Sequence, residues 1–382
     1  MNLKHLILIT ILAVAPIAAT AQTTQRITAG KANEYGLSYN LPVSTFEIVL
    51  QAEETVQIPG EFYQYAKKLL GINPIIENST SWKLVGAQII QDAVPNEEER
   101  YLVQFKNGTN VFMTLTPEGF PVAVNDGSYA PVEKVETTLF PVEAEPTILD
   151  LPVARQAVTE EMLKSQSSAK RAELAAAKIY EIRQQRSDII SGQADNMPSD
   201  GEAMKLALAQ LDQQEAALTA MFAGVTQTRR TVAVYSFRPE CRPDKDQERV
   251  VIARLSSLDG FVDADDLSGD PIYLTMKVIT RAELPKNEKG QVKTFPKGGF
   301  AYCIPGEANL SITYKDKTFA KEKMMVPQLG VVFGLDPSLF TDKKAPSFLR
   351  LDSMTGAVVE IAPVSSLAPA PAAEEPVVES EE

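Results

Sequence analysis

A long helix-forming block, from Thr159 to Ala223, interrupts a chain whose remaining sequence has the pattern of β-structure. The block is broken once, between Gly192 and Pro198. Glycine and proline at such a break end one helix and begin the next, and a connection this short favours an antiparallel return. The sequence therefore predicts a helical hairpin over residues 159–224.

Capping residues mark the ends of the two predicted helices. Gly192 and Gly224 stand where a left-handed residue ends each helix. Ser199 and Glu202 have the spacing of a capping box, in which each side chain accepts a hydrogen bond from the other residue's backbone N–H. We therefore expect one helix from Thr159 to residue 191 and a second that begins near Ser199.

The apolar residues of each predicted helix fall on one stripe. In the first helix they are Ala175, Ile179, Ile182 and Ile189, and in the second Met204, Leu208, Leu211, Leu218 and Phe222. We expect the stripes to face each other in the register that opposes Ile182 to Leu211. That register places Lys178 opposite Glu215, the one charge that interrupts the second stripe.

The first residues have the three regions of a secretory signal peptide. A charged start that includes Lys4 is followed by an apolar run and by small residues that end at Ala21. The apolar run is shorter than the roughly 20 residues that cross a bilayer, which disfavours a membrane anchor. We therefore expect residues 1–21 to be removed and the product to be periplasmic or extracellular, with outer-membrane association left open. No cysteine lies near the cleavage site, so a lipoprotein is not expected, and no later segment suits a membrane span.

Histidine is absent from the predicted mature chain, because His5 is the only one. This excludes Ser-His-Asp and Cys-His catalysis and every zinc site that contains histidine. The sequence also has no phosphate-binding loop, dinucleotide-binding loop or nucleophile elbow. We nominate no catalytic residue, no cofactor and no metal ligand. A pair of carboxylates, as in glycoside hydrolysis, is the remaining route to an enzyme.

The net negative charge of the chain indicates which classes of partner it would bind poorly. Removal of Lys4 with the signal peptide takes the net charge from −13 to −14. Such a charge disfavours nucleic acid and anionic membrane surfaces as partners. The segment 364–382 is rich in Ala, Pro, Ser, Val and Glu, which predicts a disordered acidic tail.

Two further groups of residues have alternative interpretations. Cys241 and Cys303 could form a disulfide in an oxidising compartment, or both could stay reduced. Arg183 and Arg186 lie beside the apolar stripe of the first helix, where they could grip a partner carboxylate or form a solvated helix face.

The densest acidic cluster also has two interpretations. It could bind Ca²⁺ or simply connect two strands, and its spacing departs from that of an EF-hand loop. We favour the connection. The cluster comprises Asp263, Asp265, Asp266 and Asp270.

Alternating apolar residues and turn signals predict strands on both sides of the hairpin. We expect an α+β protein with β-rich lobes over residues 22–128 and 225–363, a linker over 129–158 and a short extra helix near residues 60–70. The long antiparallel hairpin would join the two lobes. Alternatively, the two halves pack as one body with the hairpin alongside.

Several motifs together resemble one family, the exported Bacteroidota proteins that share domain of unknown function 4831. The resemblance covers nearly all of the predicted mature chain. It implies a cell-envelope location but no assigned activity or site. It would also make Asp352-Ser353-Met354 resemble an O-glycosylation motif of that phylum, for which a simple turn is the alternative. The motifs are YGLSYNLP at 35–42, FYQYAKKLLG at 62–71, IYEIRQQRSDIISG at 179–192, DGEAM at 200–204, QEAALTAMFAG at 214–224 and VDADDLSGDPIY at 262–273.

These inferences favour a non-catalytic envelope protein that binds or assembles with a protein partner. A carboxylate-dependent, carbohydrate-active hydrolase is the alternative and would need two facing carboxylates in a cleft. Glycan binding without hydrolysis is a third reading and would need an exposed aromatic platform. The exposure of the hairpin would indicate its role. Buried outer faces indicate a scaffold that joins the lobes, and a bare face indicates a docking arm.

Overall fold

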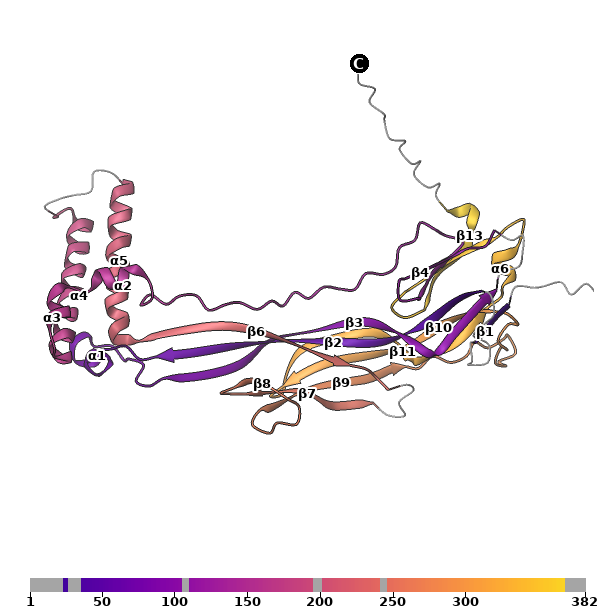
Figure 1. Cartoon of the computed structure of the whole chain (residues 1–382), viewed down its shortest axis with the longest axis horizontal. Coiled ribbons are helices and arrows are strands. Elements are labelled where there is room, and N and C mark those ends of the chain that lie inside the picture. The colour runs from indigo at the N-terminus through magenta and orange to yellow at the C-terminus, as the bar shows by residue number, and fades with distance from the viewer. Residues whose placement is uncertain (1–22, 27–35, 105–109, 195–200, 241–245, 368–382) are drawn as a thin grey trace, which may run out of the picture.

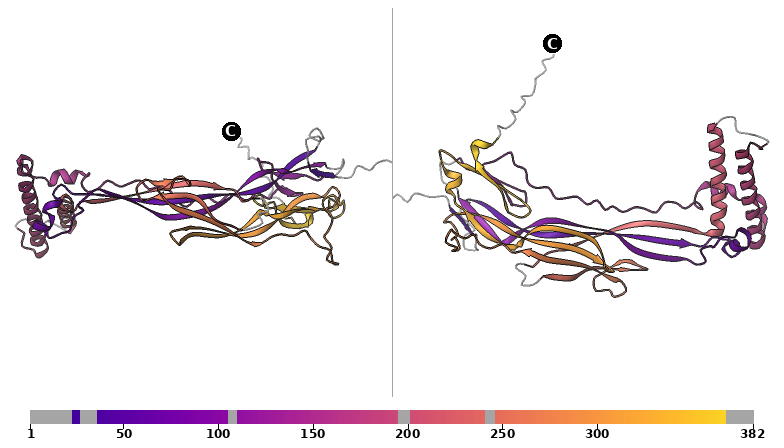
Figure 2. Two further views of the ribbon diagram at one scale, coloured as in Figure 1. Left: turned by 90° about the horizontal axis from the view of Figure 1, so that it is seen from below. Right: turned by 180° about the vertical axis from the view of Figure 1, so that it is seen from behind.

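A computed structural model of the chain describes residues 23–26, 36–104, 110–194, 201–240 and 246–367. They form an elongated molecule in which long strands make the body and most helices gather at one end (Figure 1). The views from below and from behind show the same rod, with the helices at one extremity and a small sheet at the other (Figure 2). The α+β class is confirmed.

The first sheet is built on two long antiparallel strands, β2 (Leu37–Ile58) and β3 (Ser79–Gln104). Its order is β1-β3-β2-β6, with β1 at Thr23–Arg26 and β6 at Val225–Phe237. Phe46, Ile48 and Leu50 of β2 alternate with outward-facing residues and are fully buried. The alternation expected near residue 46 therefore marks a strand that buries one face against the core.

The second sheet packs beneath the first and comes entirely from the C-terminal half. Its order is β11-β10-β9-β7-β8, and every pairing is antiparallel. Lys315 and Asp316, both with positive φ, make the tight turn from β10 to β11. The strands are β7 (Gln247–Ser256), β8 (Gly260–Val262), β9 (Asp270–Thr280), β10 (Phe300–Tyr314) and β11 (Lys317–Leu335).

A third, smaller sheet closes the end of the rod away from the helices. Its order is β13-β12-β5-β4, with strands at Met113–Leu115 (β4), Pro121–Val124 (β5), Ser347–Leu351 (β12) and Val358–Pro363 (β13). A tight turn precedes β5, in which the Gly119 N–H donates to the Thr116 carbonyl and Gly119 has a φ of 88°. The short helices α6 (Ser338–Thr341) and η2 (Val364–Ser366) flank this sheet.

The two β-rich halves are interleaved and do not form the two lobes that we expected. The C-terminal strand β6 pairs with β2 of the N-terminal half, and β12 pairs with β5. The physical reason is that β2 and β3 have one apolar face, which is buried only when the second sheet packs on it. The two halves form a single body, as in the alternative arrangement, but the hairpin lies at one end of that body and not alongside it.

The predicted linker is an extended strap that runs along the rod (Figure 1). The Gln51 side chain of β2 donates to the Phe140 carbonyl at 2.7 Å, and Lys134 bridges Glu47 and Asp92 at 2.6 and 2.8 Å. Val142 makes a β-bridge to Arg230 on the free edge of β6. These contacts hold the strap on the outer face and edge of the first sheet.

The boundaries of the helices differ from the prediction, because the expected helix 159–191 is divided. Thr159 caps a short helix, α3 (Glu160–Lys164), and Ser167 caps a separate one, α4 (Ser168–Ser191). Serine side chains compete for backbone hydrogen bonds, so the Ser165–Ser168 stretch begins a new helix instead of continuing the old one. The remaining helices are α1 (Tyr63–Leu70), α2 (Pro152–Ala157) and α5 (Gly201–Ala223).

The predicted C-terminal caps of the hairpin are confirmed. Gly192 and Gly224 have φ values of 74° and 82°, in the left-handed region that glycine adopts at little cost. The capping box cannot be assessed, since Ser199 lies outside the described residues. The predicted short helix near residues 60–70 is present as α1, which ends at Gly71.

Candidate functional site

Arg183 and Arg186 lie on α4, and both are engaged across the hairpin. Arg183 Nε donates to Glu215 Oε1 at 2.6 Å. Arg186 Nη1 lies 2.6 Å from Asp212 Oδ1 and 2.7 Å from Glu215 Oε2. A partner carboxylate would have to displace Asp212 or Glu215, so the docking role of these arginines stays a prediction.

These ion pairs also correct the predicted register. Lys178 was expected opposite Glu215, but its Nζ bonds Glu181 of its own helix at 2.9 Å. Glu215 instead lies against Arg183 and Arg186, more than one helical turn farther toward the free end of α4. At the base of the hairpin, α1 packs against both helices.

The base of the hairpin has a compact core. Ile179 and Ile182 of α4 pack with Leu218 and Phe222 of α5. Phe62, the residue directly before α1, belongs to the same cluster. Ala172, Ala175 and Ala176 of α4 are buried in the same cluster. The base of the hairpin is therefore well packed and has its own hydrophobic cluster.

The free half of the hairpin has no such core. Within the described residues, none of positions 183–191 on α4 or 201–216 on α5 is buried. Ile190 is 68% exposed and Leu206 is 73% exposed. Both lie outside the apolar stripes of the two helices. A large apolar residue in such a position is a sequence signal for exposed apolar surface, and it could have identified both.

Both helices project away from the strand body, so nothing in the described chain covers this free half (Figure 1). We call Ile190, Leu206 and the half-buried Met204 and Leu208 the hairpin tip. The bare face that would indicate a docking arm is therefore present.

The hairpin, the strap and the strand body lie within one family match. Residues 35–359 match the family model described as Domain of unknown function (DUF4831). The chain belongs to this family. No curated protein and no solved structure matches the chain.

The opposite end of this DUF4831 protein has a cavity of about 390 Å³ between the third sheet and α6. Phe112, Phe340 and Val364 give it a partly apolar lining. Asn125 lies at its base with a φ of 57°, and its Nδ2 donates to the carbonyls of Phe340 and Ser347 at 3.2 and 2.9 Å. Its hydrogen bonds therefore tie β5 to α6 and β12.

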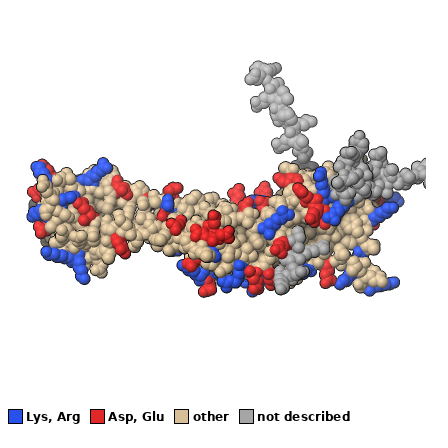
Figure 3. Space-filling model, turned by 60° about the horizontal axis from the view of Figure 1, so that its bottom comes forward, with Lys and Arg blue, Asp and Glu red and all other residues tan. Residues whose placement is uncertain are grey.

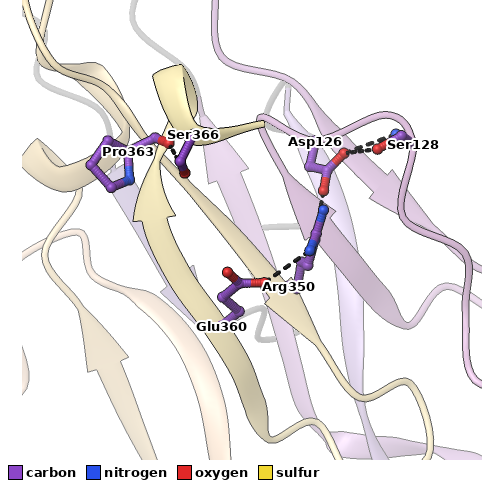
Figure 4. Close-up of polar contacts among 6 residues, drawn as sticks. All are labelled: Asp126, Ser128, Arg350, Glu360, Pro363 and Ser366. Carbon is purple, nitrogen blue, oxygen red and sulfur yellow. Dashed lines mark hydrogen bonds and ion pairs between the residues drawn. The ribbon is translucent and has the colours of Figure 1, made fainter. Parts of the chain in front are cut away.

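A buried ion pair lies next to Asn125 (Figure 4). Asp126 is 1% exposed, and its Oδ2 accepts from Arg350 Nε at 2.7 Å. Burial favours the neutral acid, but hydrogen bonds from Ser128 and Arg350 outweigh it and hold the pKa of Asp126 below its usual value. Arg350 also pairs with Glu360 at 2.8 Å, which links β12 to β13.

The same close-up shows how the chain leaves this sheet. Ser366 Oγ donates to the Pro363 carbonyl at 2.6 Å, within the turn that ends β13 (Figure 4). Asp126 and Arg350 are 224 positions apart in the chain. No local pattern marks such a pair, so it could not be predicted from the sequence.

The two cysteines are only partly described. Cys303 is buried on β10, and burial raises the pKa of its thiol to about 12. Its Sγ lies 4.0 Å from the Pro327 carbonyl. Cys241 lies outside the described residues, so a disulfide between the two stays a prediction.

The acidic cluster forms the loop from β8 to β9, where Arg254 organises the backbone. Arg254 Nε and Nη1 donate to the carbonyls of Ala264 and Gly269 at 2.7 and 3.1 Å. Asp270 pairs with Lys315 at 2.8 Å. In the described part of the chain, no three acidic, cysteine or histidine side chains form a group that could hold a metal ion.

Two further sequence features can now be placed. Ser353 is 3% exposed, and its hydroxyl accepts from the Val132 N–H at 3.1 Å, so it belongs to a buried turn between β12 and β13. Among the helices that the structure describes, none combines the length and apolarity needed to cross a membrane.

Proposed function

We propose that this protein is an exported, non-catalytic cell-envelope protein that docks a protein partner through the hairpin tip. The strand body would act as a rigid spacer that presents the helices at a distance from the other end. The signal-peptide pattern of residues 1–21 supports export.

One observation carries the docking proposal. The free half of the hairpin contains no buried residue in its described part and exposes Ile190 and Leu206, whereas the base has a complete core. Helices in proteins gain most of their stability from packing an apolar face against other elements. A helical pair that extends beyond its own core therefore has an apolar surface suited to a helical or grooved partner.

The hydrolase alternative has weaker support. The cavity beside the strap contains Glu53 and Glu143, but Glu53 already binds Lys83 at 2.7 Å and Arg230 at 3.0 Å. Hydrogen bonds from these two cations lower the pKa of Glu53, whereas a general acid for glycoside hydrolysis needs a raised pKa.

The double change Ile190→Glu and Leu206→Glu should abolish partner capture. Two carboxylates at the tip would have to be desolvated in any apolar interface, which costs several kcal/mol. The measurement is affinity capture from an envelope extract of the source organism, followed by quantitation of each captured protein and by binding of the purified partner.

The matched control is Leu258→Glu with Leu267→Glu, which places the same charges on the strand body, where these leucines are 68% and 81% exposed. A protein captured by the wild type and the control, but not by the tip variant, would support the proposal. A partner that the tip variant retains, or the lack of any reproducible partner, would contradict it.

A further inference from the structure

The outer face of the second sheet has an unusual arginine. Arg249 of β7 has a φ of 55°, which is a backbone conformation that residues other than glycine rarely adopt. Its guanidinium lies 4.2 Å from the centroid of the Tyr273 ring. The backbone N–H of Arg249 donates to Thr275 Oγ1 at 3.3 Å. Strained backbone of this kind persists where the surrounding structure holds it, and it is concentrated at functional sites.

Neighbouring strands continue this face with lysines and neutral polar groups. Ile272, Leu274 and Met276 of β9 are buried in the core, so the alternate residues Tyr273, Thr275 and Lys277 face outward. The strand register places Lys277 beside Asn309 and Lys323, and Thr275 beside Ser311 and Lys321. We call Arg249, Lys277 and Lys321, with Thr275, Asn309 and Ser311 between them, the basic strip.

The cations of the basic strip are available to a ligand. Lys323 pairs with Glu307 at 3.0 Å, but Arg249, Lys277 and Lys321 have no carboxylate partner among the described residues. All three are exposed. In a chain with a net charge of −13, three unpaired cations on one sheet face form a local attraction for anions. Figure 3, in which the bottom of the molecule is turned forward, shows both basic and acidic side chains along the middle of the rod.

We propose that the basic strip binds an acidic polysaccharide whose carboxylates pair with Arg249, Lys277 and Lys321. Strands lie about 4.8 Å apart, so Arg249 on β7 is one strand, roughly 5 Å, across the sheet from Lys277 on β9, and Lys321 on β11 is two strands, roughly 10 Å, beyond Lys277. The hydroxyls of Thr275 and Ser311 and the amide of Asn309 lie in the intervals, where they can hydrogen-bond sugar hydroxyls. Arg249 supplies the planar fork that suits a carboxylate.

Other polyanions fit this face less well. A protein interface is anchored by buried aromatic or apolar residues, and the basic strip contains none. Single-stranded nucleic acid needs exposed rings on which bases stack, but the one aromatic ring here, Tyr273, has Arg249 over its face. A hydrated chain that carries carboxylates and hydroxyls needs only the groups that are present.

The test measures binding of polygalacturonate to the full-length protein by isothermal titration at low salt. Lys277→Gln with Lys321→Gln should weaken binding by about tenfold or more, because each charge-assisted contact accounts for a large part of the affinity. Lys67→Gln with Lys68→Gln removes the same charge from exposed positions on α1 and should change affinity by less than about twofold.

Arg249→Gly separates binding from stability. Glycine adopts the left-handed conformation without strain, so this variant should unfold at no lower urea concentration than the wild type and yet bind polygalacturonate less tightly. Tyr273→Phe, which keeps the ring beneath Arg249, should bind as the wild type does. Unchanged affinity in the double lysine variant, or tighter binding of neutral dextran, polyglutamate or single-stranded DNA than of polygalacturonate, would overturn the proposal.

Discussion

Replacement of Arg350 by methionine is expected to lower the free energy of unfolding by about 3 kcal/mol at neutral pH. Methionine keeps most of the aliphatic volume beside Phe348 and Tyr129, whose rings lie 4.9 and 5.2 Å from the guanidinium. What it removes is the positive charge next to Asp126, which is 1% exposed. Removal of one partner from a buried ion pair is strongly destabilising, because the other charge stays in a poorly solvated site. Urea denaturation of the two proteins measures the difference.

The pH dependence of this loss has a defined sign. The folded-state pKa of Asp126 is lowered in the wild type, so its ionised form contributes stability above the unfolded-state pKa and loses that contribution as the pH falls. Without Arg350, burial would raise the pKa of Asp126, and the variant would gain relative stability when the acid is protonated. The gap between wild type and variant should therefore be widest near pH 7 and narrow at about pH 3.

The double variant Arg350→Met with Asp126→Asn distinguishes charge from packing. Asparagine is neutral and can still accept from the Ser128 N–H and hydroxyl, which contact Asp126 Oδ1 at 2.9 and 2.7 Å. If the uncompensated charge causes the loss, the double variant should lose only about 1 kcal/mol. Equal loss in the single and double variants would show that the stacked guanidinium matters through packing and not through its charge.

Local features of the fold were predictable from the sequence. The turn at Lys315-Asp316, the helix end at Gly192 and the alternation around Ile48 each depend on residues close together in the chain. The division of the predicted first helix was missed because residues 165–168 contain neither glycine nor proline, and capping by the Ser167 side chain decides the boundary.

Features that depend on long-range pairing were not predictable. The antiparallel pairing of β2 with β6 joins segments from the two halves of the chain, and a single sequence contains no signal for it. The hairpin register failed for a similar reason, because it depends on contacts between residues far apart in the chain, such as Arg183 with Glu215. The sequence placed Arg183 and Arg186 beside the apolar stripe, but it did not indicate that Glu215 and Asp212 pair with them.

The helical end should unfold independently when its core is damaged. Phe222 is fully buried, and its ring centroid lies 5.3 Å from that of Phe62. The cluster around these rings shares no residue with the two clusters that stabilise the strand body. Truncation of a buried phenylalanine to alanine costs about 3 to 5 kcal/mol, so Phe222→Ala should destabilise α4 and α5 by that amount and leave the sheets intact.

Hydrogen exchange resolved by segment provides the measurement. Since each 1.4 kcal/mol changes an equilibrium tenfold, the slowest amides at the base of α4 and α5 should exchange at least about a hundredfold faster in Phe222→Ala, while those of β2 and β10 keep the wild-type rates. Leu206→Ala, at a position that is 73% exposed, is the matched control and should leave both regions unchanged. Under the proposed function, Phe222→Ala should also lose the tip partner but keep polygalacturonate binding at the basic strip. Faster exchange throughout the strand body would instead show that the helices and the sheets unfold as one unit, and the rod could then not serve as an independent spacer.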